Sequence, residues 1–200
     1  MKSTLAITAA ATLAILACGK KADQAQAPRT EPKVAEAPAS PAPGHAASVP
    51  DTFQAGIGKV YEGYLQIESA LAHDDFTGAK AAFESMHAVL HVLPKDVLDS
   101  THEAGWESLD ASFMEVLHPM ASSKDIDAMR NHLAEFTPLV VEALEGFGAR
   151  TGSKAYLFHC PMAKKNTGAD WLQSEAKMLN PYFGAKMPTC GNLVREINLL

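Results

Sequence analysis

The chain has 200 residues, with 17 Lys and Arg against 23 Asp and Glu, a net charge of −6 at pH 7, and 47% hydrophobic residues. Charge divides unevenly: residues 51–152 hold 6 basic and 17 acidic side chains, while residues 153–200 hold 6 and 3. An acidic chain without a basic stripe excludes a nucleic-acid-binding protein of the usual electrostatic kind. The length suits one domain with a real core, preceded by a shorter N-terminal region.

The N-terminus has the pattern of an export signal. Residues 1–17 contain one basic residue, Lys2, followed by an apolar run too short to span a bilayer. The sequence Ile-Leu-Ala-Cys at 15–18 resembles a lipobox, which implies cleavage after residue 17 and acylation of Cys18. The residue after Cys18 is Gly19 rather than Asp. This pattern resembles that of bacterial lipoproteins sorted by default to the outer membrane, so we expect a lipoprotein anchored on the periplasmic face of that membrane. An ordinary secretory signal with a free Cys18 is the alternative.

The next segment is predicted to be a tether. Residues 19–50 contain six of the twelve prolines and few large apolar side chains, so folding would bury too little surface to offset the lost entropy. Residues 18–50 therefore form a lipidated Cys and a disordered linker, in which His45 is expected to be solvated. Residues 51–200 form the folded domain.

Four stretches with helical spacing of apolar residues predict four helices. The stripes are Phe53, Ile57, Val60, Tyr61, Tyr64, Leu65, Ile67 and Leu71; Phe76, Ala79, Phe83, Met86, Leu90 and Leu93; Trp106, Leu109, Phe113, Val116 and Leu117; and Ile126, Met129, Leu133, Phe136, Leu139, Val140, Leu144 and Phe147. The expected N-caps are Asp51 or Thr52 for the first helix, Asp74 or Asp75 for the second, and Ser122 with Asp125 as a capping box for the fourth. The third helix is expected to begin near Ser100 or Thr101. The third helix is expected to end at His118-Pro119. Short loops favour a mainly α fold, an antiparallel four-helix bundle.

The bundle contains two histidines that share a helix face. His87 and His91 are spaced i, i+4 and can chelate in principle, with His118 or His132 as further neighbours. No Glu or Cys accompanies them in a tight motif, so a solvated or hydrogen-bonded pair is the expected reading. The bundle methionines are expected to fill the core.

The last fifth of the chain holds two sulfur-bearing clusters, His159-Cys160-Pro161-Met162 and Met187-Pro188-Thr189-Cys190-Gly191. Residues 155–158 have strand-like composition, 169–178 are expected to form a short helix, and the whole region is expected to be an irregular loop. Thiolate, thioether and imidazole are ligands that suit the soft cations Cu(I) and Ag(I). The candidate metal ligands are His159, Cys160, Met162, Met187 and Cys190.

Other readings of the clusters remain open. Two cysteines in an exported domain often pair, and a Cys160–Cys190 disulfide would stabilise the fold by about 3 to 4 kcal/mol in the chain-entropy model. Redox switching between disulfide and metal site is a third reading. Zinc is the runner-up metal, bound by two cysteines, His159 and one more ligand. Trp171 is expected to be a packed indole, with a ring face over bound Cu(I) as the alternative.

An enzyme with Cys160 as nucleophile is not favoured, because adjacent residues such as His159 rarely meet productively and no nucleophile motif surrounds them. The sequence shows neither a Cys-x-x-Cys-His haem motif nor a glycine-rich phosphate loop.

About a dozen positions carry a resemblance: Tyr156, His159-Cys160-Pro161-Met162-Ala163, Trp171-Leu172, Asn180-Pro181-Tyr182-Phe183-Gly184, Met187 and Cys190-Gly191. This pattern resembles a bacterial periplasmic domain of unknown function, found in exported proteins and at the C-termini of adaptor subunits of heavy-metal efflux pumps. The preceding helices, through residues 125–127 and Arg130, fit the pattern too. The Cys-Pro-Met and Cys-Gly pieces are also similar to a small heavy-metal-binding domain, which usually has a second Cys in the later cluster.

The resemblance implies a link to copper or silver export. We therefore expect an exported lipoprotein that binds Cu(I) or Ag(I) through residues 153–200 and buffers it or passes it to an efflux adaptor. The alternative is a disulfide-stapled interaction module that docks a partner through the bundle or through an exposed turn at 180–184.

Overall fold

The computed structural model describes residues 46–200. The predicted signal peptide, Cys18, His45 and almost all of the predicted tether lie outside the described residues. The helices are α1 (Asp51–Ala72), α2 (Phe76–His91), α3 (Ser100–Ala121), α4 (Ile126–Phe147) and the one-turn α5 (Ala163–Asn166); short 3₁₀ turns are η1 (Ala46–Ser48), η2 (Lys95–Val97) and η3 (Gly184–Lys186). The strands are β1 (Ala155–Cys160), β2 (Ala169–Gln173) and β3 (Asn192–Ile197).

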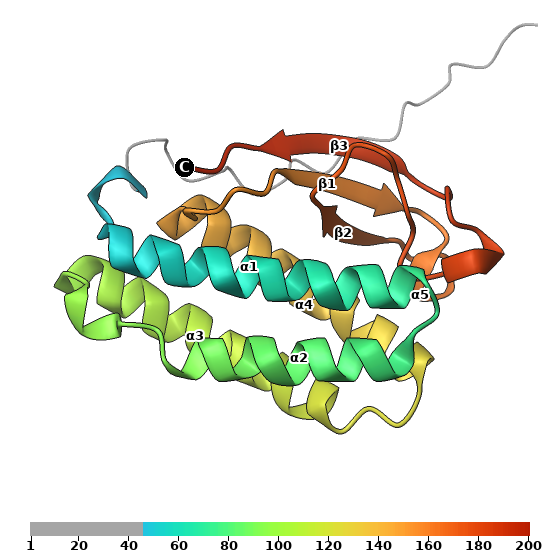
Figure 1. Ribbon diagram of the computed structural model, residues 1–200, viewed down its shortest axis with the longest axis horizontal. Coiled ribbons are helices and arrows are strands. Elements are labelled where there is room, and N and C mark those ends of the chain that lie inside the picture. Colours follow the sequence, from blue (N-terminus) through green and yellow to red (C-terminus); the bar gives the residue numbers. More distant parts are fainter. Residues whose placement is uncertain (1–45) are drawn as a thin grey trace, which may run out of the picture. The chain divides into compact units, whose positions relative to one another are not determined.

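The predicted mainly helical fold is confirmed, with a sheet added to it. Helix α1 packs against α2 and α4, and α3 packs against α4 and α2 (Figure 1). The four predicted helices are therefore present, and each apolar stripe supplies buried residues to one continuous core. At one end of this core three aromatic rings pack together, with centroids 5.0 to 5.6 Å apart; they belong to Phe53, Trp106 and Phe147.

Aspartate side chains cap three of the four long helices. Asp75 accepts a hydrogen bond from the Gly78 N–H at 2.8 Å, as predicted. Helix α3 begins at Ser100, as predicted, and Asp99 caps it by accepting from two backbone N–H groups. Asp125, rather than Ser122, caps α4, because its carboxylate reaches the first free N–H groups of the helix.

Two other boundaries were predicted wrongly. Helix α1 has Pro50 at the N-cap position and no side-chain cap, so neither Asp51 nor Thr52 fills that role. Helix α3 continues past His118-Pro119 to Ala121. The extra turn places Met120 in the core with no exposed surface, and that burial favours continuing the helix.

The C-terminal region is a three-stranded antiparallel sheet in the order β2-β1-β3, rather than an irregular loop. The predicted helix at 169–178 is wrong, because residues 169–173 form β2. Trp171 and Leu172 are fully buried there. Strand β2 packs on α1 and α4, and the Tyr64 hydroxyl links the layers by accepting from the Leu172 N–H at 3.1 Å. The sheet thereby fixes the end of β1, where Cys160 lies.

Helix α1 buries one carboxyl group without a hydrogen-bonding partner. Glu68 is 4% exposed, and its Oε1 has no partner in the structure. Burial raises the pKa of this carboxyl well above its usual value. The folded state therefore holds the Glu68 proton more tightly than the unfolded chain does. The free energy of unfolding keeps the full contribution of this proton below a pH of about 4.3 and loses it as the pH rises toward the folded pKa.

Replacing Glu68 with Met is therefore expected to stabilise the protein. The substitution removes an unsatisfied buried group, which costs about 1 to 3 kcal/mol, and should raise the free energy of unfolding at pH 7 by that order. The gain should shrink toward pH 4. Urea denaturation of both proteins from pH 4 to pH 8 measures it, and a variant less stable at pH 7 would contradict the reading.

Candidate metal centre

The structure brings the two predicted cysteines together. Cys160 ends β1 and is fully buried, while Cys190 lies half-buried in the loop before β3. Their Sγ atoms are 3.4 Å apart, and both residues are free thiols. A disulfide needs about 2.05 Å between the sulfurs, so the pair is close but not bonded.

A buried asparagine fixes the position of Cys190. The Asn180 side chain donates from Nδ2 to the Cys190 carbonyl oxygen at 2.6 Å, and its backbone N–H donates to the Pro188 carbonyl at 2.8 Å. Its Oδ1 accepts from the Tyr182 and Phe183 N–H groups. Asn180 thus ties one loop to the backbone of the thiol-bearing loop.

The segment at 180–184 is consequently a structural element, and its predicted role as an exposed docking turn is wrong for most of its residues. Asn180, Pro181, Tyr182 and Gly184 are buried. The Tyr182 hydroxyl donates to the Asp170 carbonyl oxygen on β2, which holds the segment against the sheet.

Arg130 of α4 anchors the same segment to the helices. Its guanidinium is 7% exposed and donates to the Pro181 carbonyl at 2.6 Å, to the Leu71 carbonyl at 2.8 Å and to the Asp74 carboxylate at 2.7 Å. Asp74 also accepts from the Ala185 N–H at 3.0 Å. The Ala185 N–H and the Arg130 guanidinium hold the pKa of Asp74 below its usual value. A Cβ on Gly184 would lie 2.2 Å from Asp74 Oδ1, and its φ of 53° also requires glycine.

His159 points to a different place from the thiols. Neighbouring residues of a strand project to opposite faces, and His159 pairs in register with Asp170 of β2. Its Nδ1 lies 2.6 Å from the Asp170 carboxylate. Its Nε2 is turned toward Gly168, where a Cβ would lie 3.0 Å away. The structure therefore separates the imidazole from the cysteine pair.

The two methionines lie within three residues of the cysteines in sequence. Met162 is two residues beyond Cys160, and 45% of its surface is exposed. Met187 is half-buried, and its carbonyl oxygen accepts from the Cys190 N–H at 3.3 Å, which closes a turn. The end of β1, α5 and the loop around η3 lie at the same end of the domain (Figure 1). Both thioethers are thus carried by segments adjoining the cysteine pair.

Within residues 46–200, no three side chains among His, Cys, Asp and Glu converge in a way that could hold a metal ion. A site of two cysteines and His159, as expected for zinc, therefore finds no support in this geometry. Any metal at the cysteine pair would need methionine sulfur or solvent as further ligands.

The cysteine pair influences its own protonation. The hydrogen bond to Cys160, then burial, raise the pKa of the Cys190 thiol. A catalytic cysteine usually needs a lowered pKa, because the thiolate is the nucleophile. The raised pKa therefore makes Cys190 poorly suited to act as a nucleophile.

Trp171 is a packed indole, as expected. It has no exposed surface, stacks on Phe158 with centroids 5.3 Å apart, and meets Tyr182 edge-on at 6.0 Å. Its Nε1–H donates to the Gln173 side chain at 3.0 Å. A Cβ at Gly191 would lie 2.9 Å from the indole and 2.6 Å from the His159 carbonyl oxygen, so glycine is required there. Trp171 thereby shapes the backbone next to Cys190.

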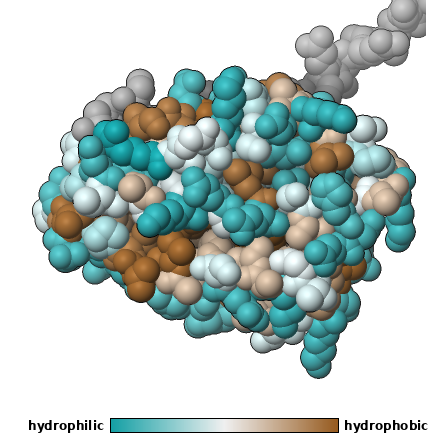
Figure 2. All heavy atoms as spheres, viewed as in Figure 1, coloured by the Kyte–Doolittle hydropathy of each residue, from teal (hydrophilic) through white to brown (hydrophobic). Residues whose placement is uncertain are grey.

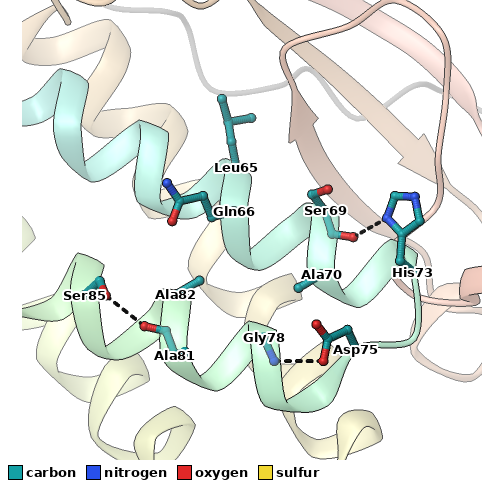
Figure 3. Close-up of a pocket in the computed structure, with 10 residues that line it drawn as sticks. All are labelled: Leu65, Gln66, Ser69, Ala70, His73, Asp75, Gly78, Ala81, Ala82 and Ser85. Atoms are coloured by element: carbon teal, nitrogen blue, oxygen red, sulfur yellow. Dashed lines mark hydrogen bonds between the residues drawn. The ribbon is translucent and has the colours of Figure 1, made fainter.

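A hollow on the helical side of the domain contains none of the predicted ligands. It lies between α1 and α2 and is lined mostly by small side chains, with His73 and Asp75 at one end (Figure 3). On the face shown in Figure 2, hydrophilic side chains break the hydrophobic surface into separate patches. None of the helices described for residues 46–200 combines the length and apolar character needed to cross a membrane.

Comparison with known proteins adds one match. Residues 60–152 match the model of a family described as protein of unknown function, DUF3347. The match spans most of the four-helix region and ends before β1, so the cysteine and methionine clusters lie outside it. No curated protein and no solved structure matches the chain. The helical region is therefore similar to a family without an assigned activity, and the metal hypothesis rests on the chemistry of residues 153–200.

Removing the Asn180 side chain is expected to weaken metal binding without removing a ligand. Groups that orient metal ligands typically contribute about 10- to 100-fold to affinity, so Asn180→Ala should lower Cu(I) affinity by roughly that factor. Asn192→Ala, at an exposed residue of β3, is the matched control and should leave the affinity unchanged. A competition titration of the three reduced proteins measures the effect, and equal affinities for all three would contradict the positioning role.

Proposed function

We propose that the protein binds one Cu(I) or Ag(I) ion through the Cys160 and Cys190 thiolates, with Met162 and Met187 supplying the remaining sulfur. The observation that carries the proposal is the 3.4 Å separation of the two Sγ atoms in the free thiol state. The all-sulfur donor set is soft, which favours Cu(I) and Ag(I) over harder cations.

The sulfur separation also favours a particular coordination number. Metal–sulfur bonds of about 2.3 Å place two thiolates about 3.8 Å apart in tetrahedral geometry, about 4.0 Å in trigonal geometry and about 4.6 Å in a linear arrangement. The observed pair needs to open by a few tenths of an ångström for three or four ligands and by more than 1 Å for two. This supports recruitment of one or both methionines.

In this proposal the helices form an antiparallel bundle that supports the sheet, and Cys18 and residues 19–50 anchor the domain at the periplasmic face of the outer membrane. The function is buffering of the metal or its delivery to a heavy-metal efflux adaptor. We do not assign an enzymatic role, which agrees with the raised pKa of the Cys190 thiol.

The second candidate is a disulfide-stapled interaction module. It is favoured by the same sulfur pair, because a movement of about 1.4 Å would bring the atoms to bonding distance. The two candidates differ in the state of the purified protein: the stapled module predicts no free thiol in residues 46–200 after aerobic isolation and no change in function on metal removal.

An anaerobic titration of the reduced protein with Cu(I), against a competing chromophoric chelator, tests the proposal. Tight binding of one ion per chain supports it. If the reduced protein takes no copper from the chelator, the metal function is excluded and the stapled module remains.

Copper binding is expected to release protons and to strengthen with pH. Thiols must lose their protons to act as ligands, and the raised pKa of Cys190 keeps its proton on in the free protein at pH 7. Below that pKa, each unit of pH rise should raise the apparent affinity up to about tenfold for each proton displaced. Titrations from pH 6 to pH 8 test this; an affinity independent of pH would argue against thiolate ligands.

A further inference from the structure

Two histidines on α2, far from the cysteines in sequence, form a pair that the proposed function does not use. His87 and His91 lie one helical turn apart, and their Nε2 atoms are 3.2 Å apart. The rings meet nearly at right angles, with centroids 4.4 Å apart. His87 is half-buried and His91 is exposed, so solvent reaches the pair.

The first ring of the pair is held in place. His87 stacks on Phe83 one turn earlier, with an interplanar angle of 14° and centroids 5.5 Å apart. A ligand side chain that is already ordered loses less conformational entropy when it binds. The surface therefore presents one imidazole held by stacking and one exposed imidazole at chelating distance.

The distance between the ring nitrogens suits a shared metal ion. Imidazole nitrogens bind divalent metals at about 2.0 to 2.1 Å, so two of them on one ion are about 2.9 to 3.4 Å apart at right-angled or tetrahedral geometry. The observed 3.2 Å falls in that interval. In the free protein the two Nε2 atoms share a hydrogen bond, which an ion would replace.

Neutral rings are needed for this replacement. Burial, and then the nearby His91 and His118, lower the pKa of His87. The ring that carries its proton on Nε2 must shift to the Nδ1–H tautomer, which frees both Nε2 lone pairs and leaves the total number of protons unchanged.

We propose that His87 and His91 chelate one divalent transition-metal ion of the zinc, nickel or copper(II) class, separately from the soft site at the cysteines. Imidazole suits these borderline ions, whereas the all-sulfur set suits Cu(I). Because no third His, Cys, Asp or Glu joins them in the described part of the chain, water completes the coordination, and the ion exchanges readily. The chain would then carry one monovalent ion at the cysteines and one exchangeable divalent ion on α2.

A Zn²⁺ titration of the full-length reduced protein, followed through the imidazole ¹H–¹⁵N resonances, tests the proposal. These signals report on each histidine directly, so zinc bound at the cysteines does not obscure them. The His87 and His91 signals should shift together and saturate at one ion. Both His87→Gln and His91→Gln should weaken this binding by roughly tenfold or more, while His73→Gln, at an exposed histidine after α1, should not.

The proposal is overturned if the His87 and His91 signals stay unchanged while other histidines respond, or if His87→Gln leaves the zinc affinity unaltered. Either result would leave His87 and His91 as a hydrogen-bonded pair without a metal role. Because the readout does not involve copper or the thiols, this outcome is independent of whether the cysteine site binds Cu(I).

Discussion

Replacing Cys160 with Ser is expected to lower the Cu(I) affinity of the reduced protein by more than about 100-fold. Orienting groups around a metal contribute about 10- to 100-fold, and a thiolate ligand contributes more than a group that only orients one. Ser is nearly isosteric, but its hydroxyl is a hard donor that suits Cu(I) poorly. Cys190→Ser should have a similar effect, and the double variant should not compete with the chelator.

Two controls separate ligand loss from general damage. His159→Gln should retain the wild-type affinity, because the structure turns that ring toward Asp170 and away from the thiols. Met114→Leu changes a thioether packed beside the bundle core, far in sequence from the cysteines, and should also have no effect. If His159→Gln loses as much affinity as Cys160→Ser, the ligand set proposed above is wrong.

Replacing Arg130 with Met is expected to destabilise the protein by about 1 to 3 kcal/mol for each buried carbonyl oxygen that loses its donor. The substitution leaves the Leu71 and Pro181 carbonyl oxygens without their donor and frees the Asp74 carboxylate. Because these contacts join α1, α4 and the 180–186 loop, the loss should appear both as a lower midpoint in urea and as faster amide exchange in that loop.

Arg150→Met is the matched control for this experiment. Arg150 is exposed and bonds Asp51 and Gln54, and exposed ion pairs contribute only about 0 to 1 kcal/mol. If both arginine variants lost the same free energy of unfolding, the buried hydrogen bonds of Arg130 would contribute no more to stability than an exposed ion pair. The pKa of Asp74 adds a second check: it is lowered in the folded state, so its contribution is present at neutral pH and is lost as the pH falls through the folded pKa.

The helical part of the fold was predictable because its signals are local. The spacing of Phe53, Ile57 and Tyr64, and the equivalent residues of the other stripes, follows the helical period along one segment. Cap positions were harder, since Asp99 and Asp125 compete with neighbouring Ser and Thr residues that can also accept from a free N–H. The end of α3 was predicted too early, at His118-Pro119. The helix tolerates the clash between the proline ring and the preceding turn because the next residue, Met120, is buried in the core.

The C-terminal region was harder to predict because its structure depends on residues distant in sequence. The apolar residues of the segment 169–173 follow neither a helical nor a strand spacing clearly. This segment forms a strand because it pairs with β1. The polarity of Asn180 suggested exposure, but its hydrogen bonds go to a loop ten residues later. Arg130 and Asp74 were not singled out as a pair, because nothing in the sequence indicates that a helix and a distant turn share one guanidinium.

The candidate site was predicted in part. The two cysteines were expected to meet, and they do. His159 was grouped with them because it is adjacent in sequence, but adjacency in a strand places side chains on opposite faces. The identity of the metal follows from donor chemistry alone and stays a prediction.

X-ray absorption at the copper K edge of the Cu(I)-loaded protein tests the central claim most directly, because it counts the atoms bound to the metal. We expect a first shell of three or four sulfur atoms, falling by one in Cys160→Ser and unchanged in His159→Gln. A first shell of nitrogen and oxygen, or one that is unaffected by loss of Cys160, would contradict copper binding at the paired cysteines.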